Sequence, residues 1–164
     1  MTPYSALALQ MDCHAVNGLA DRAAVGQAMS STLDRVDQLI AGSKGFIGTF
    51  SGDTLRLVVL PEYFLTSFPM GESIPEWRTK ACIEMDGPEY QHMGEIARNR
   101  GVYLSGKAYE VDPPFLGAAA VGAACRQVGF LNKAPDKRFF HGDETYGPPD
   151  HFKTAGSDLG CSSL

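Results

Sequence analysis

Apolar residues recur at helical spacing through residues 19–40. Successive positions lie three or four residues apart, which places them on one face of an α-helix. Gly42 is suited to end this helix, and residues 45–53 are rich in turn formers. We therefore expect a helix over residues 19–40. Its apolar positions are Val25, Met29, Leu33, Val36 and Ile40.

Two short apolar runs predict strands on either side of this helix. Residues 6–11 are followed by a polar cluster, which is the pattern of a buried strand that leads into a loop. Residues 55–60 are almost continuously apolar, which is typical of a strand covered on both faces. Pro61 stops ladder pairing, so Glu62 lies just past the strand's carboxyl end. Ligand crevices of open α/β sheets lie at that end.

A second helix is expected from the Gly87-Pro88 pair to Gly101, because proline suits a first helical turn and glycine a helix end. Residues 102–106 then form a third strand, and residues 107–111 either extend it or begin another element. The order strand, helix, strand, helix, strand predicts an α/β architecture.

The remaining segments carry weaker patterns. Residues 67–75 indicate a loop, residues 77–83 stay unassigned, and residues 117–124 are a Gly/Ala run without clear period. In the last part of the chain only residues 128–131 look like a strand, because residues 133–163 are rich in Gly, Pro and Asp. With neither a repeat nor a linker, we expect one domain over residues 1–164.

Composition and charge narrow the function classes. The chain has 164 residues, 44% hydrophobic and 20% charged, in the ordinary globular range. Its 14 Lys and Arg are scattered singly and its net charge is −5, so nucleic acid is not an expected partner. Without a signal-like N-terminus or an apolar run of roughly 20 residues, we expect no membrane association and a cytoplasmic protein.

The four cysteines are widely spaced and form no CxxC pair. This pattern lacks the density of a disulfide scaffold, so we expect reduced thiols, of which at most one is chemically active.

Two sequence blocks resemble the nitrilase, or carbon-nitrogen hydrolase, superfamily. The first is LRLVVLPEYFLTSFP at residues 55–69, which looks like the first catalytic motif of that family. The second is DGPEYQHMGEIARNRGVYLSG at residues 86–106, with its glycine-proline helix start. Together with the opening strand and long first helix, the resemblance covers residues 4–111 and becomes faint after Asp112.

The resemblance implies a fold and a class of partner. Nitrilase-like domains are four-layer α-β-β-α sandwiches longer than this chain, so we expect an α/β domain that is incomplete at its C-terminal end and divergent over residues 112–164. It also implies a small-molecule amide or nitrile substrate, a homo-oligomer and no cofactor.

The resemblance further implies a Glu, Lys and Cys triad. Glu62 matches the general base that accepts the thiol proton and later activates water. Lys133 follows the apolar run 128–131 and matches the lysine that stabilises the oxyanion, with Lys137 as the competing candidate. Cys161, preceded by a glycine, has the chain order of the nucleophile, although little chain follows it. Each of these residues also has a plain interpretation as a surface side chain or an incidental thiol.

Glu144 matches the second glutamate with which many family members orient the substrate. It belongs to an acidic and histidine cluster whose other members are Asp143, Asp150 and His151. Because this cluster lacks regular ligand spacing and is rich in turn residues, we expect a polar loop and no metal.

Two further hypotheses remain open. The first is that the chain is not an active hydrolase but a catalytically inactive fragment of the same fold, which acts, if at all, as an interaction protein. The second is a flavodoxin-like binding domain. It fits the order of elements, but neither of the first two strands is followed by a Gly-rich phosphate loop.

Overall fold

The computed structural model describes residues 4–84, 87–111, 125–132 and 140–143, the last two segments by their backbone alone. The strands are β1 (Ser5–Ala8), β2 (Leu55–Val59), β3 (Tyr103–Val111), β4 (Cys125–Asn132) and β5 (Phe140–Asp143). The helices are α1 (Arg22–Phe50), α2 (Ile74–Ala81) and α3 (Pro88–Arg100). None of the described helices combines the length and apolar character that a membrane span requires.

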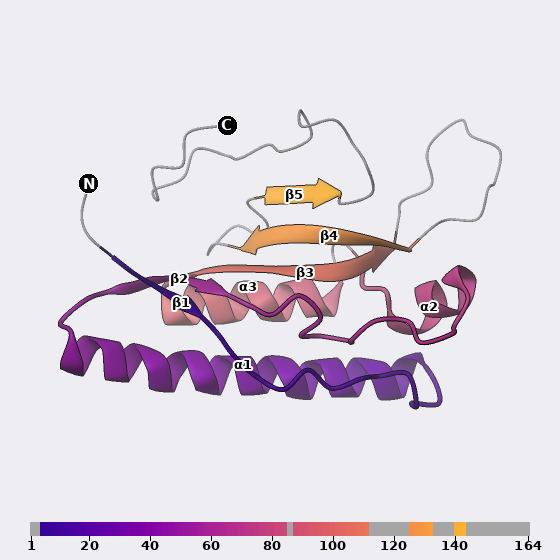
Figure 1. Cartoon of the computed structure of the whole chain (residues 1–164), viewed down its shortest axis with the longest axis horizontal. Helices are drawn as coiled ribbons and strands as arrows, with labels where there is room; N and C mark the ends of the chain where they lie inside the picture. Colours follow the sequence, from indigo (N-terminus) through magenta and orange to yellow (C-terminus); the bar gives the residue numbers. More distant parts are fainter. Residues whose placement is uncertain (1–3, 85–86, 112–124, 133–139, 144–164) are drawn as a thin grey trace.

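The strands form one sheet in the order β1-β2-β3-β4-β5. β1, β2 and β3 are parallel, and β4 and β5 continue the sheet in antiparallel fashion. Figure 1 shows α1 and α3 side by side beneath this sheet. Helical connections between parallel strands make this an α/β protein, as the order of elements predicts.

The apolar stripe predicted for the first helix forms the centre of the core. All five predicted positions of α1 are at most 1% exposed. They pack with residues of β2, α3 and β3 in one continuous cluster. At the start of α1, the side chain of Asp21 accepts a hydrogen bond from the backbone N–H of Ala24, which satisfies a free helix donor.

The expectation that Gly42 ends the first helix is wrong. α1 continues to Phe50, and the turn is made by Gly52, whose φ of 72° lies in the left-handed region. Glycine costs about 1 kcal/mol relative to alanine inside a helix, so other contacts must offset it. One of them is the Lys44 ammonium, which donates a hydrogen bond to the carbonyl of Arg100 at the end of α3.

The second predicted helix is confirmed at both ends. α3 begins at Pro88, and Gly101 caps it with a φ of 64°. Ion pairs of arginine with carboxylates fix α3 against α1. Arg100 contacts Asp37 at 2.6 Å, and Arg22 contacts Glu89 at 2.6 Å.

The weaker sequence patterns gave several wrong boundaries. β1 is shorter than the predicted residues 6–11, and α2 takes in the end of the predicted loop 67–75 and part of the unassigned stretch 77–83. A capping box at Ser73 and Glu76 begins α2. β4 extends the predicted strand 128–131, and β5 lies in a stretch where no strand was expected.

Candidate functional site

Glu62 lies just beyond the carboxyl end of β2, as the sequence predicts. The backbone N–H of Leu60 donates a 2.8 Å hydrogen bond to the carbonyl of Ser105, which holds the end of β2 against β3. The chain then turns at Pro61, and the Glu62 side chain remains 47% exposed. The carboxylate is therefore accessible to a molecule from solvent.

Lys107 contacts Glu62 from the neighbouring strand. Its Nζ lies 3.3 Å from Oε1 of Glu62, and its side chain is 35% exposed. Because β3 pairs with β2 only up to the Val59 and Ser105 register, its later residues run on past the end of β2. This overhang brings Lys107 beside the turn that carries Glu62.

Tyr109 lies on the same face of β3 as Lys107, since alternate residues of a strand share a face. Burial raises the pKa of the Tyr109 phenol, and the neighbouring Tyr63 and Glu62 raise it further. The phenol therefore stays protonated well into alkaline solution and remains a hydrogen-bond donor beside the Glu62 carboxylate.

Aromatic rings stand around these polar groups. The Trp77 ring of α2 meets Tyr109 edge to face, with centroids 5.7 Å apart. On the turn after β2, Tyr63 and Phe68 have centroids 5.4 Å apart. Trp77 is buried in the core, whereas Phe68 is 47% exposed and offers an apolar surface to the uncharged part of a small substrate.

The turn after Glu62 is held in an unusual conformation. Ser67 has a φ of 63°, which is uncommon for a residue with a side chain, and it is 7% exposed. Its N–H donates to the carbonyl of Tyr63, and the Thr66 hydroxyl donates to the carbonyl of Ser67. Such bonds compensate for the strain, which costs of order 1 kcal/mol or more. They fix the path of the chain next to Glu62.

The other predicted site residues are Lys133, Glu144 and Cys161, with Lys137 as the alternative lysine. All four lie outside the described residues. The structure therefore brings together Glu62, Lys107 and Tyr109, of which only Glu62 was selected from the sequence. If residues 107–111 extend the strand, Lys107 and Tyr109 share one of its faces, but the polar Glu110 on the opposite face breaks the alternation that would have marked them.

Cysteine chemistry differs between the described cysteines. Cys82 is buried and disulfide-bonded, so the expectation of four reduced thiols is wrong for this residue. Cys13 is a free, exposed thiol whose pKa is raised by partial burial and by the nearby Asp12 carboxylate. A raised pKa reduces the thiolate fraction at neutral pH, so Cys13 lacks the activation that a nucleophile needs.

No cluster of three or more His, Cys, Asp or Glu side chains that could hold a metal ion is found among the described residues. Of the acidic and histidine cluster in the sequence, Asp143 ends β5 and the other members lie outside the described part.

Comparison of the sequence with protein-family models and with curated proteins gives no match.

Proposed function

We propose that this chain is a nitrilase-like hydrolase of non-peptide carbon-nitrogen bonds, acting on a small amide or nitrile. The observation that carries the proposal is the position of Glu62, an accessible carboxylate at the carboxyl end of the central parallel strand β2. Open α/β sheets bind their ligands at this end. The sequence around Glu62 also resembles the first catalytic motif of that superfamily.

In the proposed reaction with an amide, Glu62 accepts the proton of the Cys161 thiol, and the thiolate attacks the carbonyl carbon. Lys133 donates hydrogen bonds to the oxyanion that forms. The C–N bond then breaks, and the amine leaves with the proton from Glu62, which gives a thioester. Glu62 next removes a proton from water, which attacks the thioester and releases the carboxylic acid and the thiol.

Two further residues have supporting roles in this proposal. Lys107, 3.3 Å from the Glu62 carboxylate, positions it toward the nucleophile. Glu144 orients the substrate, as the resemblance to the superfamily implies.

The proposed fold is one half of an α-β-β-α sandwich. In support, α1 and α3 lie side by side on one side of the sheet, and Val59 in the central strand is 40% exposed. A second sheet packed on that exposed face would complete the four layers. As part of the same proposal, the chain forms a homo-oligomer in the cytoplasm, although a disulfide such as that of Cys82 is uncommon in that compartment. Sedimentation of the purified protein tests the oligomer, and fractionation of its host cells tests the location.

The test is ammonia release from a panel of small amides and nitriles by the purified chain. We expect turnover in the parent protein and a loss of about a thousandfold or more in Glu62→Gln and in Cys161→Ala. Glu95→Gln and Cys13→Ala are matched controls, because Glu95 and Cys13 are exposed residues that the mechanism does not use. Lys107→Met should lower kcat by a smaller factor than Glu62→Gln does.

Unchanged turnover in Cys161→Ala would overturn the mechanism. If the parent chain releases no ammonia and iodoacetamide labels Cys161 no faster than Cys13, the chain is instead a catalytically inactive protein of the same fold. Mass spectrometry of the protein after a short incubation with substrate gives an independent readout, since a thioester adds the mass of the acyl group to Cys161.

A further inference from the structure

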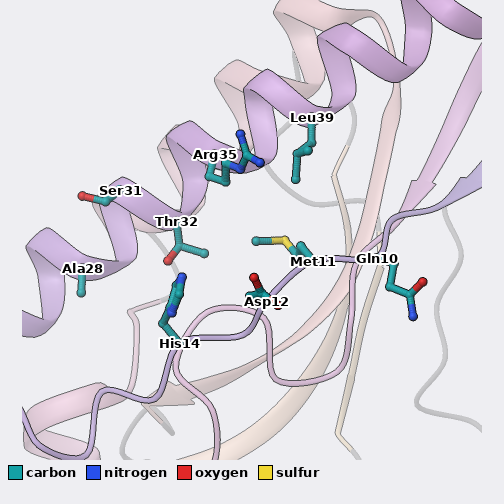
Figure 2. Close-up of a pocket in the computed structure, with 9 residues that line it drawn as sticks. All are labelled: Gln10, Met11, Asp12, His14, Ala28, Ser31, Thr32, Arg35 and Leu39. Carbon is teal, nitrogen blue, oxygen red and sulfur yellow. The ribbon is translucent and has the colours of Figure 1, made fainter.

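A cavity of about 790 Å³ lies between α1 and the segment that follows β1. Figure 2 shows that one wall comes from Gln10, Met11, Asp12 and His14 and the other from α1. Glu62 is not among the residues that line it. Its volume is in the range of small-molecule sites, which is roughly 300–1,000 Å³.

Thr32 is a buried polar residue in the wall of this cavity. It is 7% exposed, and Figure 2 shows its side chain directed into the cavity toward His14. Serine and threonine in helices commonly donate to the carbonyl four residues earlier, as Thr49 and Thr79 do here. Within the described part of the chain, the Thr32 hydroxyl makes no hydrogen bond of this or any other kind. Its hydrogen-bonding capacity is directed into the cavity.

Opposite charges stand on the two walls. Asp12 belongs to the segment after β1, and Arg35 lies one turn along α1 from Thr32. Among the described residues, neither side chain takes part in an ion pair, with the other or with a third group. The cavity therefore presents an anionic and a cationic group that do not neutralise each other by contact. A ligand with both charges would complement both walls.

Ala28, Met11 and Leu39 form the apolar part of the lining, and Gln10, His14 and Ser31 complete it with polar side chains. Met11 points into the cavity in Figure 2, and Leu39 extends the helix wall beyond Arg35. Binding sites for small organic molecules combine apolar surface with polar groups that converge on the ligand.

We infer that this cavity binds a small zwitterion with an ammonium and a carboxylate, of the class of an apolar α-amino acid. Arg35 and the Thr32 hydroxyl receive the carboxylate, because a guanidinium and a hydroxyl both donate hydrogen bonds. Asp12 receives the ammonium, and the apolar side chain of the ligand packs against Met11 and Leu39. The inference is independent of the proposed hydrolase chemistry at Glu62.

The test is isothermal titration of the full chain with alanine, valine, leucine and methionine. Two analogues of leucine serve as matched probes. Isopentylamine keeps the ammonium and lacks the carboxylate, and 4-methylpentanoate keeps the carboxylate and lacks the ammonium. We expect saturable binding of at least one of the four amino acids. Each leucine analogue should bind about tenfold or more weakly than leucine, because it leaves one charged wall without a partner.

Variants assign the binding to this cavity. Binding should weaken about tenfold in each of Arg35→Gln, Asp12→Asn and Thr32→Val. Thr32→Ser keeps the hydroxyl and should bind about as tightly as the parent. Arg98→Gln and Glu95→Gln alter exposed charges on α3, outside the cavity, and should bind as the parent does. Circular dichroism and thermal unfolding check that each variant is folded.

The inference is overturned if none of the four amino acids binds. It is also overturned if either leucine analogue binds as tightly as leucine, or if folded Arg35→Gln and Asp12→Asn proteins bind as the parent does. A loss of hydrolase activity in Glu62→Gln with unchanged amino-acid binding would separate this site from the proposed catalytic one.

Discussion

The phenol of Tyr90 donates a 2.9 Å hydrogen bond to the carboxylate of Glu110, and both side chains are fully buried. Tyr90 belongs to α3 and Glu110 to β3, so this bond fixes one face of the strand toward the helix. Lys107 is an odd number of residues from Glu110 and therefore lies on the other face, where it contacts Glu62. A bond in the core thus sets which side chains of β3 reach the candidate site.

Removing this bond should destabilise the protein. In Tyr90→Phe the buried carboxylate of Glu110 loses one hydrogen-bond donor, which costs about 1–3 kcal/mol of unfolding free energy. Urea denaturation of the variant and the parent measures the difference. Tyr63→Phe is the control, because its hydroxyl makes no hydrogen bond within the described residues; an equal loss in both variants would contradict the explanation.

The Asp37 and Arg100 pair should make stability depend on pH in acid. Hydrogen bonds from Arg100 are the largest cause that holds the pKa of Asp37 below its ordinary value of 3.8. Because the folded-state pKa is the lower one, the pair contributes stability above pH 3.8 and loses it as pH falls through the folded-state pKa. Asp37→Asn should cost about 1 kcal/mol at pH 7 and progressively less in acid.

The measurement is urea denaturation of Asp37→Asn and the parent protein at several pH values between neutral and strongly acid. Glu95→Gln, which alters an exposed carboxylate of α3, serves as the control. A difference between Asp37→Asn and the parent that stays constant over the whole series would contradict the assignment.

Helical glycines offer sites for stabilisation. A Cβ added at Gly45 meets no atom within 4 Å, so Gly45→Ala should raise the unfolding free energy by about 0.5–1 kcal/mol through helix propensity. Gly101→Ala should do the opposite, because its φ of 64° is strained for alanine. Thermal unfolding of the two variants checks the prediction, which fails if their melting temperatures move in the same direction.

Cys13 should react slowly with alkylating agents at neutral pH. Its pKa is raised by partial burial and by the Asp12 charge, which leaves little thiolate. Asp12→Asn removes the second cause and should speed alkylation of Cys13 by iodoacetamide, as peptide mass mapping over time would measure. A rate in the parent protein that equals or exceeds that of a simple thiol would contradict the assignment.

Local patterns predicted much of the fold. The α1 stripe, the Pro88 start and the Gly101 end of α3 follow from short-range periodicity and from the backbone preferences of single residues. Gly42 was misinterpreted because a contact 56 residues apart, between Lys44 and Arg100, supports the longer helix. The sequence next to Gly42 carries no sign of that contact.

The sequence likewise predicted only part of the candidate site. Glu62 was found from its position after an apolar run and a proline, which is local information. Lys107 was missed because its contact with Glu62 depends on the register of β2 against β3 and on how far β3 extends past β2. Register is set by pairing between distant segments, so periodicity alone does not give it.

The position of β1 at the edge of the sheet has a consequence for handling the protein. Among the described strands β1 pairs with β2 alone, and its sequence SALA carries no charge or proline that would discourage a further strand from joining it. Two features limit such pairing, namely the length of β1, which is only 4 residues, and the register shift between Ser5 and Ala6. A strand from another molecule would therefore find only a short stretch to pair with at this edge, and a lysine in place of the exposed Ala6 would discourage that pairing further.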